Sequence, residues 1–184
     1  MDTMYTGSGD EGYTGLLGPG RVPKYDPRIA ASGDVDEASA ALGLARALAK
    51  SEQVRATLLD AQRDLYHLMA EVAATPDAAG RFHRIDAERV AWLEARIQAL
   101  GATLSPLREF VVPGDSLAGA ALHLARTVVR RAERQVAQLV HSGAITNPDL
   151  LRYLNRLSSL CFALARVEDA AAGITRETLA KDAD

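Results

Sequence analysis

Cysteine is almost absent from the sequence, and its scarcity excludes several kinds of site. Cys161 is the only cysteine among 184 residues, so the chain forms no internal disulfide and holds no multi-cysteine metal site. Aromatic residues make up only 5% of the sequence, whereas alanine and leucine are abundant, which favours helices. The sequence also lacks an apolar run of transmembrane length and the apolar segment of a signal peptide. We therefore expect a cytoplasmic protein with no membrane partner.

A large excess of charge of either sign is missing as well. The formal net charge is −3, so the composition gives no support to a nucleic-acid partner, and we expect none. Hydrophobic residues make up 48% and charged residues 24% of the chain, as in folded globular proteins. A chain of 184 residues is long enough to bury the core of one domain.

Five segments carry the hydrophobic spacing of helices, and we see no strand run and no internal repeat. The segments cover residues from about 34 to 50, 51 to 74, 86 to 100 and 115 to 142, followed by a helix that starts at Asn147-Pro148. Asparagine is a good N-cap, and proline is favoured at the first helical position. The buried stripes expected for the second and fifth segments are Val54, Leu58, Ala61, Leu65 and Leu68, and Leu150, Leu154, Leu157, Cys161 and Leu164. The pattern predicts an all-α bundle of about five helices.

The first 32 residues differ in composition from the rest of the chain. They hold six of the 14 glycines and three of the seven prolines, so we predict a loop or a flexible arm. Residues 7–12 match the glycine pattern of dinucleotide-binding folds, but that pattern needs a preceding strand, for which there is no room. The stretch is not a P-loop either, because Tyr13 stands where the lysine is required. The backbone amides of its glycines and its side-chain hydroxyls suit the binding of a phosphate. The alternative is a flexible terminus without a ligand.

Arginines recur every four residues in the fourth segment. The row consists of Arg126, Arg130 and Arg134, and the face opposite is predicted to be apolar, with Leu124, Val128, Ala132, Val136 and Leu139. Each like-charged pair at this spacing costs roughly 0.2–0.5 kcal/mol, and within the helix only Glu133 offers relief. The row is therefore either a solvated face that pairs with acids such as Asp36 and Glu37, or a site for an anion.

Several short segments form a pattern when they are taken together. They are residues 5–16 with 20–24 beside them, 33–37, 110–114, 126–134 and 153–158. In this order they resemble the TGDxGxT arm with its basic extension, the GTVDE helix start, the F-[IV]-[LV]-P-G connector, the RxxxRRAER helix and the YLNRLSD segment of PduO-type ATP:cob(I)alamin adenosyltransferases. The resemblance runs from about residue 5 to residue 167.

This resemblance implies a five-helix bundle that assembles as a homotrimer, with ATP bound at each subunit interface. The implied reaction transfers the 5′-deoxyadenosyl group of ATP to the cobalt of cob(I)alamin and releases triphosphate. Cob(I)alamin is itself the nucleophile, which fits the lack of an identifiable serine or cysteine nucleophile in the sequence. ATP as co-substrate, Mg²⁺ and cobalamin as substrate are thus implied. A cobalamin reductase and an adenosylcobalamin-dependent enzyme are the further partners that it implies.

The resemblance also implies roles for individual residues at the phosphates. Arm residues would wrap the phosphates, and Lys24 would add charge. These arm residues are Thr6, Ser8, Gly9, Asp10, Gly12 and Thr14. Arg130 would face the phosphates, and Arg134 would lie beside it. The support for a phosphate contact is weaker for Arg134, which is the residue of the row that we expect to be solvated. Glu133 would support Mg²⁺ or the arginines, and Asn155 would bind the nucleotide.

Two further roles concern the subunit interface and the cobalamin. Arg126 would pair with Asp36 of a neighbouring subunit and help to close the site. Phe110 would push away the lower axial ligand of cobalamin, because an apolar ring excludes a ligand without supplying one. The catalytic residues implied are therefore Asp36, Phe110, Arg126 and Arg130, of which Phe110 binds cobalamin.

Four residues depart from the family pattern: Gly7, Tyr25, Ser39 and Ser159. Gly7 stands where Lys or Arg is usual and Ser159 where Asp is usual, so both affect the expected contacts to phosphate or Mg²⁺. They motivate an alternative function, a helical ATP-binding or adenosylcobalamin-escort protein with weakened catalysis. In either case we divide the chain into an ATP-binding arm (1–32), a five-helix bundle (33–175) and a C-terminal tail (176–184).

Overall fold

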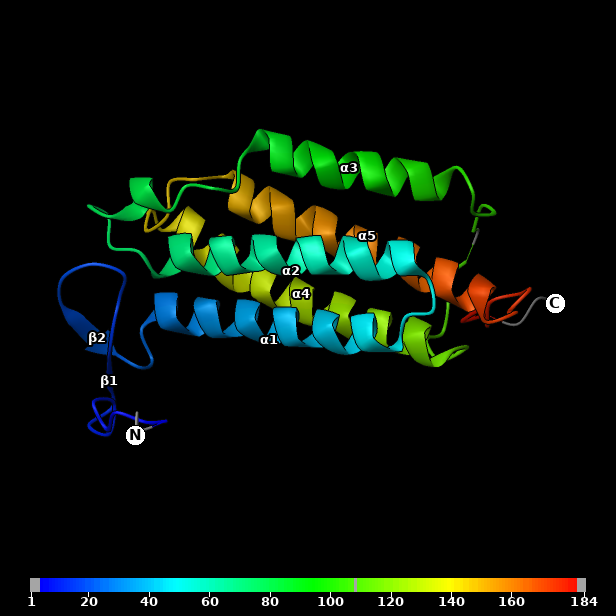
Figure 1. The fold of residues 1–184 in the computed structure, drawn as a ribbon. Coiled ribbons are helices and arrows are strands. Elements are labelled where there is room, and N and C mark those ends of the chain that lie inside the picture. The colour runs from blue at the N-terminus through cyan, green and yellow to red at the C-terminus, as the bar shows by residue number, and fades with distance from the viewer. Residues whose placement is uncertain (1–3, 108, 182–184) are drawn as a thin grey trace.

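Five long helices run up and down in an elongated bundle (Figure 1). The computed structural model describes residues 4–107 and 109–181, so residues 1–3 of the predicted arm and 182–184 of the predicted tail lie outside it. The helices are α1 (Pro27–Leu48), α2 (Glu52–Ala73), α3 (Ala87–Gly101), α4 (Leu117–His141) and α5 (Asp149–Ala171), with a short 3-10 turn, η1 (Ala79–Arg81), before α3. The predicted all-α bundle is confirmed. Within the described ranges, no helix combines the length and the apolar character needed to cross a bilayer.

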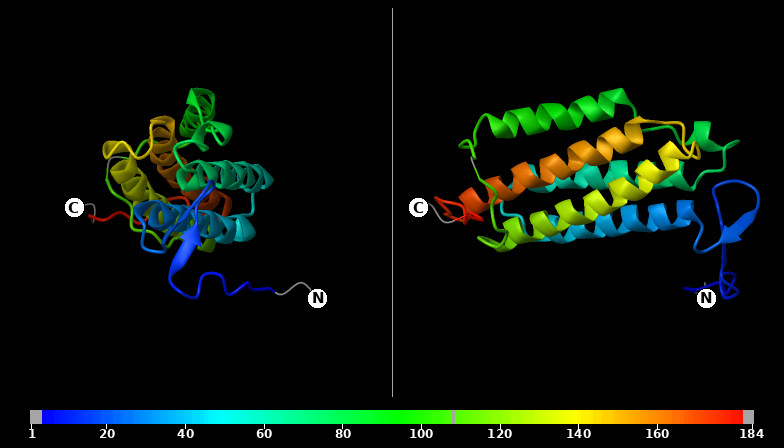
Figure 2. Two further views of the ribbon diagram at one scale, coloured as in Figure 1. Left: turned by 90° about the vertical axis from the view of Figure 1, so that its left-hand side faces the viewer. Right: turned by 180° about the vertical axis from the view of Figure 1, so that it is seen from behind.

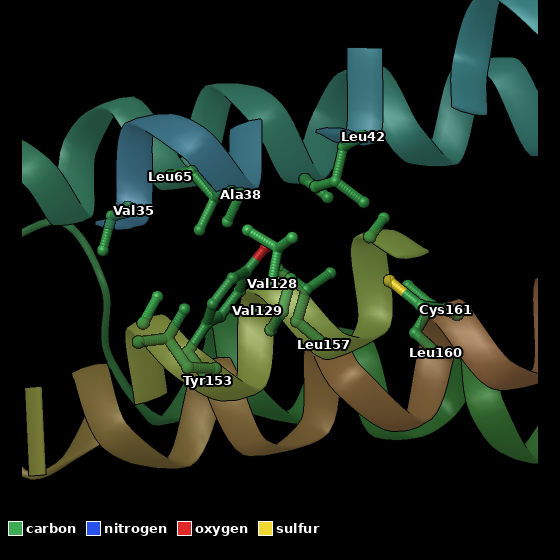
Figure 3. Close-up of a cluster of buried hydrophobic side chains, with 14 of the residues drawn as sticks. Val35, Ala38, Leu42, Leu65, Val128, Val129, Tyr153, Leu157, Leu160 and Cys161 are labelled. Atoms are coloured by element: carbon green, nitrogen blue, oxygen red, sulfur yellow. The ribbon is translucent and has the colours of Figure 1, made fainter. Parts of the chain in front are cut away.

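Helix α4 lies between α1 and α5 and packs against both, while α3 packs on the outside of α5 (Figure 2). Figure 3 shows Val128 and Val129 of α4 in the layer between α1 and α5, together with Tyr153 and Leu157 of α5. The predicted stripes of α2 and α5 are buried as expected. Leu124 was placed on the buried face of α4 and is 52% exposed, so that part of the prediction is wrong. Two flanking helices bury a different and wider arc, which includes Leu122 and Ala125.

Side-chain caps set the helix starts. Helix α1 begins at Pro27, where the Asp26 carboxylate accepts a hydrogen bond from the Arg28 amide at 2.9 Å. The start predicted near Asp34 is therefore wrong, and residues 27–32 are helical rather than part of the arm. The N-cap of α5 is Pro148 and not Asn147, so the predicted start is one residue too early, although the Asn147 side chain accepts a hydrogen bond from the Asp149 amide at 3.0 Å.

The arm contains a small hairpin, so the expectation of no strand was wrong for these residues. Strands β1 (Tyr13–Gly15) and β2 (Arg21–Pro23) pair antiparallel. Just after β1, the amide of Leu17 donates to the Ala73 carbonyl at 2.8 Å, and the amide of Thr75 donates to the Leu17 carbonyl at 3.1 Å. These two hydrogen bonds attach the arm to the carboxyl end of α2. The rest of the arm extends away from this end of the bundle (Figure 1).

A buried polar cluster joins three helices. The Tyr153 hydroxyl of α5 donates to the Asp64 carboxylate of α2 at 2.7 Å, and the Arg89 guanidinium of α3 donates to the same oxygen. Arg89 also lies over the Trp92 ring, 4.4 Å from its centroid. Burial and the neighbouring Asp64 raise the pKa of Tyr153 well above its ordinary value, so its hydroxyl keeps the proton that it donates.

Cys161 lies in the core beside Leu157 and Leu160 (Figure 3). Burial raises the pKa of its thiol to about 12, so the group is neutral at physiological pH. The interpretation of Cys161 as a small buried hydrophobic residue is confirmed.

Replacing Tyr153 with Phe should lower the free energy of unfolding by about 1–2 kcal/mol, because a buried hydrogen bond to a charged group is lost. Denaturant titration at fixed protein concentration measures this change. Tyr66→Phe is the control, because Tyr66 is 66% exposed, and its change should stay within about 0.5 kcal/mol. Equal changes in the two variants would contradict a role for the Asp64 cluster in stability.

Gly18→Ala should loosen the attachment of the arm. Gly18 has φ +148°, and a Cβ there would lie 2.6 Å from Cγ2 of Thr75, at the point where Leu17 binds the end of α2. Gly20→Ala is the matched control, because Gly20 also has positive φ (+97°) but open space around it. We expect trypsin to cleave after Arg21 severalfold faster in Gly18→Ala than in Gly20→Ala. Equal cleavage rates would show that the contact with Thr75 does not hold the arm.

Candidate functional site

A cavity of about 700 Å³ lies between α3, α4, α5 and the connector that joins α3 to α4. We call it the apolar cavity. Its apolar lining includes Ile97, Leu104, Leu107, Phe110, Val111, Phe162 and Ala163. Its polar lining includes His123, Arg126, Arg130, Ser158 and Arg166. Three predicted site residues, Phe110, Arg126 and Arg130, therefore line one cavity.

Phe110 lies in the connector rather than in a helix. Its residue is 84% exposed, although it lines the apolar cavity. Burial of an aromatic side chain is strongly favourable, so a ligand that covered this ring would gain free energy from the contact. The position fits a ring that meets a ligand in the cavity.

Two polar groups in the wall of the apolar cavity are buried without a partner. Arg126 Nε and His123 Nδ1 make no hydrogen bond to any residue that the structure describes. Burial lowers the pKa of His123, and the positive charge of Arg126 lowers it further, so the imidazole is neutral at pH 7. The ring stands edge-on to Phe162 at 5.7 Å between centroids. Buried polar atoms of this kind normally have partners, so a ligand or a second chain is expected at this wall.

A second hollow of about 430 Å³ lies between α4 and α5, and we call it the polar cavity. It is lined by Arg130, Glu133, Arg134, Ala137, Leu151, Arg152, Asn155 and Arg156. Arg130 thus lines both cavities. Four arginines and a single glutamate surround the space, a composition that suits a ligand with several negative charges.

Asn155 is held in one orientation at the wall of the polar cavity. Its amide nitrogen donates to Glu133 Oε1 at 2.8 Å, and its carbonyl oxygen accepts from Arg156 at 2.6 Å. Arg156 in turn donates to Glu94 of α3 at 2.8 Å. Arg134 donates to the Arg130 carbonyl at 2.9 Å. Three predicted nucleotide-site residues besides Arg130, namely Glu133, Arg134 and Asn155, are therefore neighbours here.

The predicted phosphate-binding residues of the arm lie in the loop before β1, in β1 and in the segment after β2. Thr6 and Ser8 share a hydrogen bond of 2.8 Å between their hydroxyls, and the Lys24 amide donates to the Gly12 carbonyl at 2.8 Å. A Cβ on Gly9 would lie 2.9 Å from Lys24 Nζ, so the lysine ammonium lies directly against this glycine. Asp10 lies in the loop before β1, and Thr14 lies in β1 itself. The fold thus brings the predicted phosphate-binding residues of the arm together with Lys24.

The arm and the connector between α3 and α4 lie at opposite ends of the bundle (Figures 1 and 2). The connector with Phe110 joins α3 to α4 at the end where α5 finishes, whereas the arm is attached beside the start of α1. A single chain therefore does not bring the arm to Phe110.

Asp36 and Arg126 do not meet within one chain. Asp36 is exposed on α1, and no ion pair joins it to the arginine row among the described residues. Arg131 of α4 pairs instead with Asp34 at 3.3 Å and with Glu37. Glu37 was considered as a partner of the row, but its observed partner is the neighbouring arginine.

Sequence reasoning missed His123, Phe162, Arg166 and Arg21. His123 precedes Arg126 by three residues, and this helical spacing could have revealed it. Arg21 donates to the carbonyls of Ser8 and Tyr13 and so holds the loop of the arm in shape. Arg166 and Phe162 carry no local pattern that separates them from other residues of α5.

The four departures from the family pattern have different surroundings. Ser159 lines the apolar cavity, and Tyr25 is 84% exposed. Gly7 has φ +67°, a left-handed conformation that residues with a Cβ rarely adopt, so glycine fits this turn. At Ser39 the backbone carbonyl accepts a hydrogen bond from Gln62 at 2.9 Å, a contact that does not involve the serine side chain.

Comparisons with known proteins agree with the geometry. The family model for cobalamin adenosyltransferase matches residues 4–168. The corrinoid adenosyltransferase PduO of Citrobacter freundii is 42% identical over 167 residues, which are 90% of this chain and 50% of that protein. The corrinoid adenosyltransferase of Bacillus subtilis (strain 168) is 40% identical over 175 residues, 93% of this chain and 89% of that protein.

A similar solved structure is a phenylalanine-to-alanine variant of a PduO-type ATP:corrinoid adenosyltransferase from Lactobacillus reuteri, complexed with cobalamin and ATP. Its TM-score is 0.88 at 32% identity, and the match covers 98% of this chain and 100% of that chain. The chain thus spans about half the length of the Citrobacter protein and the full length of the solved one. By sequence and by fold, it belongs to the cobalamin adenosyltransferase family.

Proposed function

We propose that the protein transfers the 5′-deoxyadenosyl group of ATP to the cobalt of cob(I)alamin, which forms adenosylcobalamin and releases triphosphate. The observation that carries the proposal is the position of Arg130, which lines both the apolar cavity and the polar cavity. An apolar space suits a corrinoid, and an arginine-rich space suits a triphosphate. A residue shared by both lies where the two substrates must meet.

In the proposed reaction the electron pair of cob(I)alamin forms a bond to C5′ of ATP. The bond between C5′ and the phosphate oxygen breaks, and triphosphate leaves with that electron pair. The protein contributes position and charge rather than a nucleophile. Arg130 and Arg134, with Lys24 of the arm, would meet the negative charge that develops on the leaving group.

Mg²⁺ fits the residues of the polar cavity. Glu133 is the single carboxylate among the lining residues that the structure describes, and its Oε1 accepts from Asn155. One carboxylate is enough when phosphate oxygens supply the other ligands, as is common for Mg²⁺ with nucleotides. Glu133 would hold the ion, which neutralises phosphate charge when bound.

We also propose that the protein acts as a homotrimer with the site between subunits. The arm extends away from its own bundle, and the arm and the connector that carries Phe110 lie at opposite ends of one bundle (Figure 1). Arg126 Nε is buried without a partner among the described residues, and Asp36 is exposed, so an ion pair between subunits would satisfy both. Helices α1 and α4, which pack side by side, also expose large apolar residues: Leu44, Leu48, Leu117 and Leu124.

The alternative function is a helical ATP-binding or adenosylcobalamin-escort protein with weakened catalysis. Gly7 favours it, because this residue removes a charge that relatives of this type usually carry in the arm. A cobalamin reductase, an adenosylcobalamin-dependent enzyme and the cytoplasm stay predictions for the partners and the location.

Mixing the protein with ATP, Mg²⁺ and chemically reduced cobalamin tests the function. The absorption spectrum of the corrinoid should change to that of adenosylcobalamin, and only when ATP is present. Nucleotide binding without this conversion would favour the escort protein and would contradict the proposed enzyme.

In the same assay, Arg130→Ala should lower kcat by about 10²–10³-fold, the usual cost of removing one group that stabilises transition-state charge. The variant should keep the oligomeric state of the wild type in sedimentation analysis. Arg63→Ala is the matched control, since Arg63 is exposed on α2 and its pair with Asp60 is long, at 3.6 Å. Normal turnover in Arg130→Ala would show that the phosphates lie elsewhere.

Phe110→Ala should lose most of its activity with cobalamin, whose lower axial ligand has to be displaced. It should lose much less with a corrinoid that lacks this ligand, because nothing then remains for the ring to exclude. The ratio of the two initial rates is the measurement. Equal losses of initial rate with both corrinoids would show that Phe110 does not displace the lower ligand.

A further inference from the structure

After α5 the chain reverses at Gly173 and returns beside the connector that carries Phe110. Gly173 has φ +88°, and its amide donates to the Ala170 carbonyl at 3.0 Å. The Ile174 amide donates to the Asp169 carbonyl, also at 3.0 Å. These two bonds form a Schellman motif, in which a left-handed glycine ends the helix and turns the chain. We call the residues that follow, 174–180, the C-terminal strap.

The backbone of the strap pairs with the connector in an antiparallel arrangement. Leu179 and Val111 form an antiparallel bridge. The Ala180 amide donates to the Phe110 carbonyl at 2.7 Å, and the Val112 amide donates to the Thr178 carbonyl at 2.7 Å. The backbone is therefore held at Phe110 itself and two residues after it.

Side chains tie both ends of the connector to the strap. Near the end of the connector, the Asp115 carboxylate accepts from the Thr178 amide at 2.9 Å and from its hydroxyl at 2.6 Å. Near the start, Arg166 of α5 donates to the Ser105 carbonyl at 2.7 Å and to Glu177 Oε1 at 2.7 Å. Arg166 is buried and also lines the apolar cavity. One guanidinium thus binds α5, the connector and the strap to one another.

The ring of Phe110 depends on this support because little else holds it. At 84% exposure the side chain gains almost no packing from its own chain. Its location at the rim of the cavity therefore follows from its backbone, and the backbone follows from the strap.

We propose that the C-terminal strap positions Phe110 at the rim of the apolar cavity, with Arg166 and Glu177 as positioning residues. The inference rests on the proposed function, in which Phe110 displaces the lower axial ligand of cobalamin. It adds a requirement for residues beyond the helical bundle. Loss of the strap should impair the displacement of that ligand rather than the transfer itself.

Ala180→Pro is the most direct variant, because it removes the N–H group that donates to Phe110 and changes an exposed side chain. With cobalamin its rate should fall about fivefold to tenfold, as for the loss of one hydrogen bond, and with a corrinoid lacking the lower ligand it should stay within about twofold of wild type. Lys181→Pro is the matched control, since its amide makes no hydrogen bond within the described residues. This control should behave as wild type with both corrinoids.

Hydrogen exchange gives a readout that does not depend on activity. The Val112 amide should exchange severalfold faster in Ala180→Pro than in Lys181→Pro, because the strap that accepts its hydrogen bond is loosened. Glu177→Gln, which weakens the contact with Arg166, should show the same pattern. Glu52→Gln is its control, because Glu52 forms an exposed pair with Arg55 on α2.

The outcomes separate the inference from the function on which it rests. If Ala180→Pro and Glu177→Gln lose activity equally with both corrinoids, or leave the rates and the exchange of Val112 unchanged, the strap does not position Phe110. If Phe110→Ala itself loses the same fraction of its rate with both corrinoids, the ring does not displace the lower ligand, and the function on which the inference rests is wrong at that point. A wild-type protein that forms no adenosylcobalamin would overturn the proposed function, while faster exchange at Val112 would still report the strap.

Discussion

The burial of α4 between α1 and α5 is the constraint on which the rest of the molecule depends. Successive residues of a helix point about 100° apart, so two neighbouring arginines of α4 face different helices. Arg131 faces α1 and pairs with Asp34 and Glu37, which is a structural role. Arg130 faces the α5 side and lines both cavities. The same packing that buries Val128 and Val129 thus divides one basic run into a residue that joins helices and a residue available to a ligand.

The proposed site is incomplete within one chain. Arg126 and His123 present buried polar atoms with no partner among the described residues, and burial of such atoms costs free energy unless something pairs with them. The arm, in which Lys24 lies against Gly9, is at the far end of the bundle from the connector between α3 and α4 (Figure 1). Both observations favour an assembly in which the arm and Asp36 of one subunit complete the cavities of another. The oligomer would then be required for the reaction as well as for stability.

The bundle could be predicted from the sequence where the hydrophobic spacing and the caps agree. The buried stripe of α5 and the hydrogen bond from the Asp149 amide to the Asn147 side chain follow from local rules. The start of α1 was misplaced because Asp34, Asp36 and Glu37 resemble the acidic first turn of a helix, although Asp26-Pro27 carried the better signal. Leu124 was misplaced because a single periodic stripe does not show that α4 has two neighbours. The motifs named Phe110, Arg130 and Asn155, but no sequence pattern shows the contact between Val111 and Leu179, 68 residues apart, since it arises only when the ends of two helices meet.

Gly7 changes how charge is distributed around the proposed triphosphate. Its left-handed backbone would strain the usual basic residue at this position, so glycine suits the turn and the arm has one cation fewer. Arg21 does not replace that cation, because its guanidinium is engaged by the carbonyls of Ser8 and Tyr13. The Lys24 ammonium, in contrast, lies against Gly9 in the loop that is proposed to bind the phosphates. In the proposed reaction the stabilisation of the leaving group would therefore fall mainly on Arg130 and Arg134, which make no ion pair with any carboxylate among the described residues. The arm would serve chiefly to enclose the nucleotide, and the electrostatic part of catalysis would belong to α4.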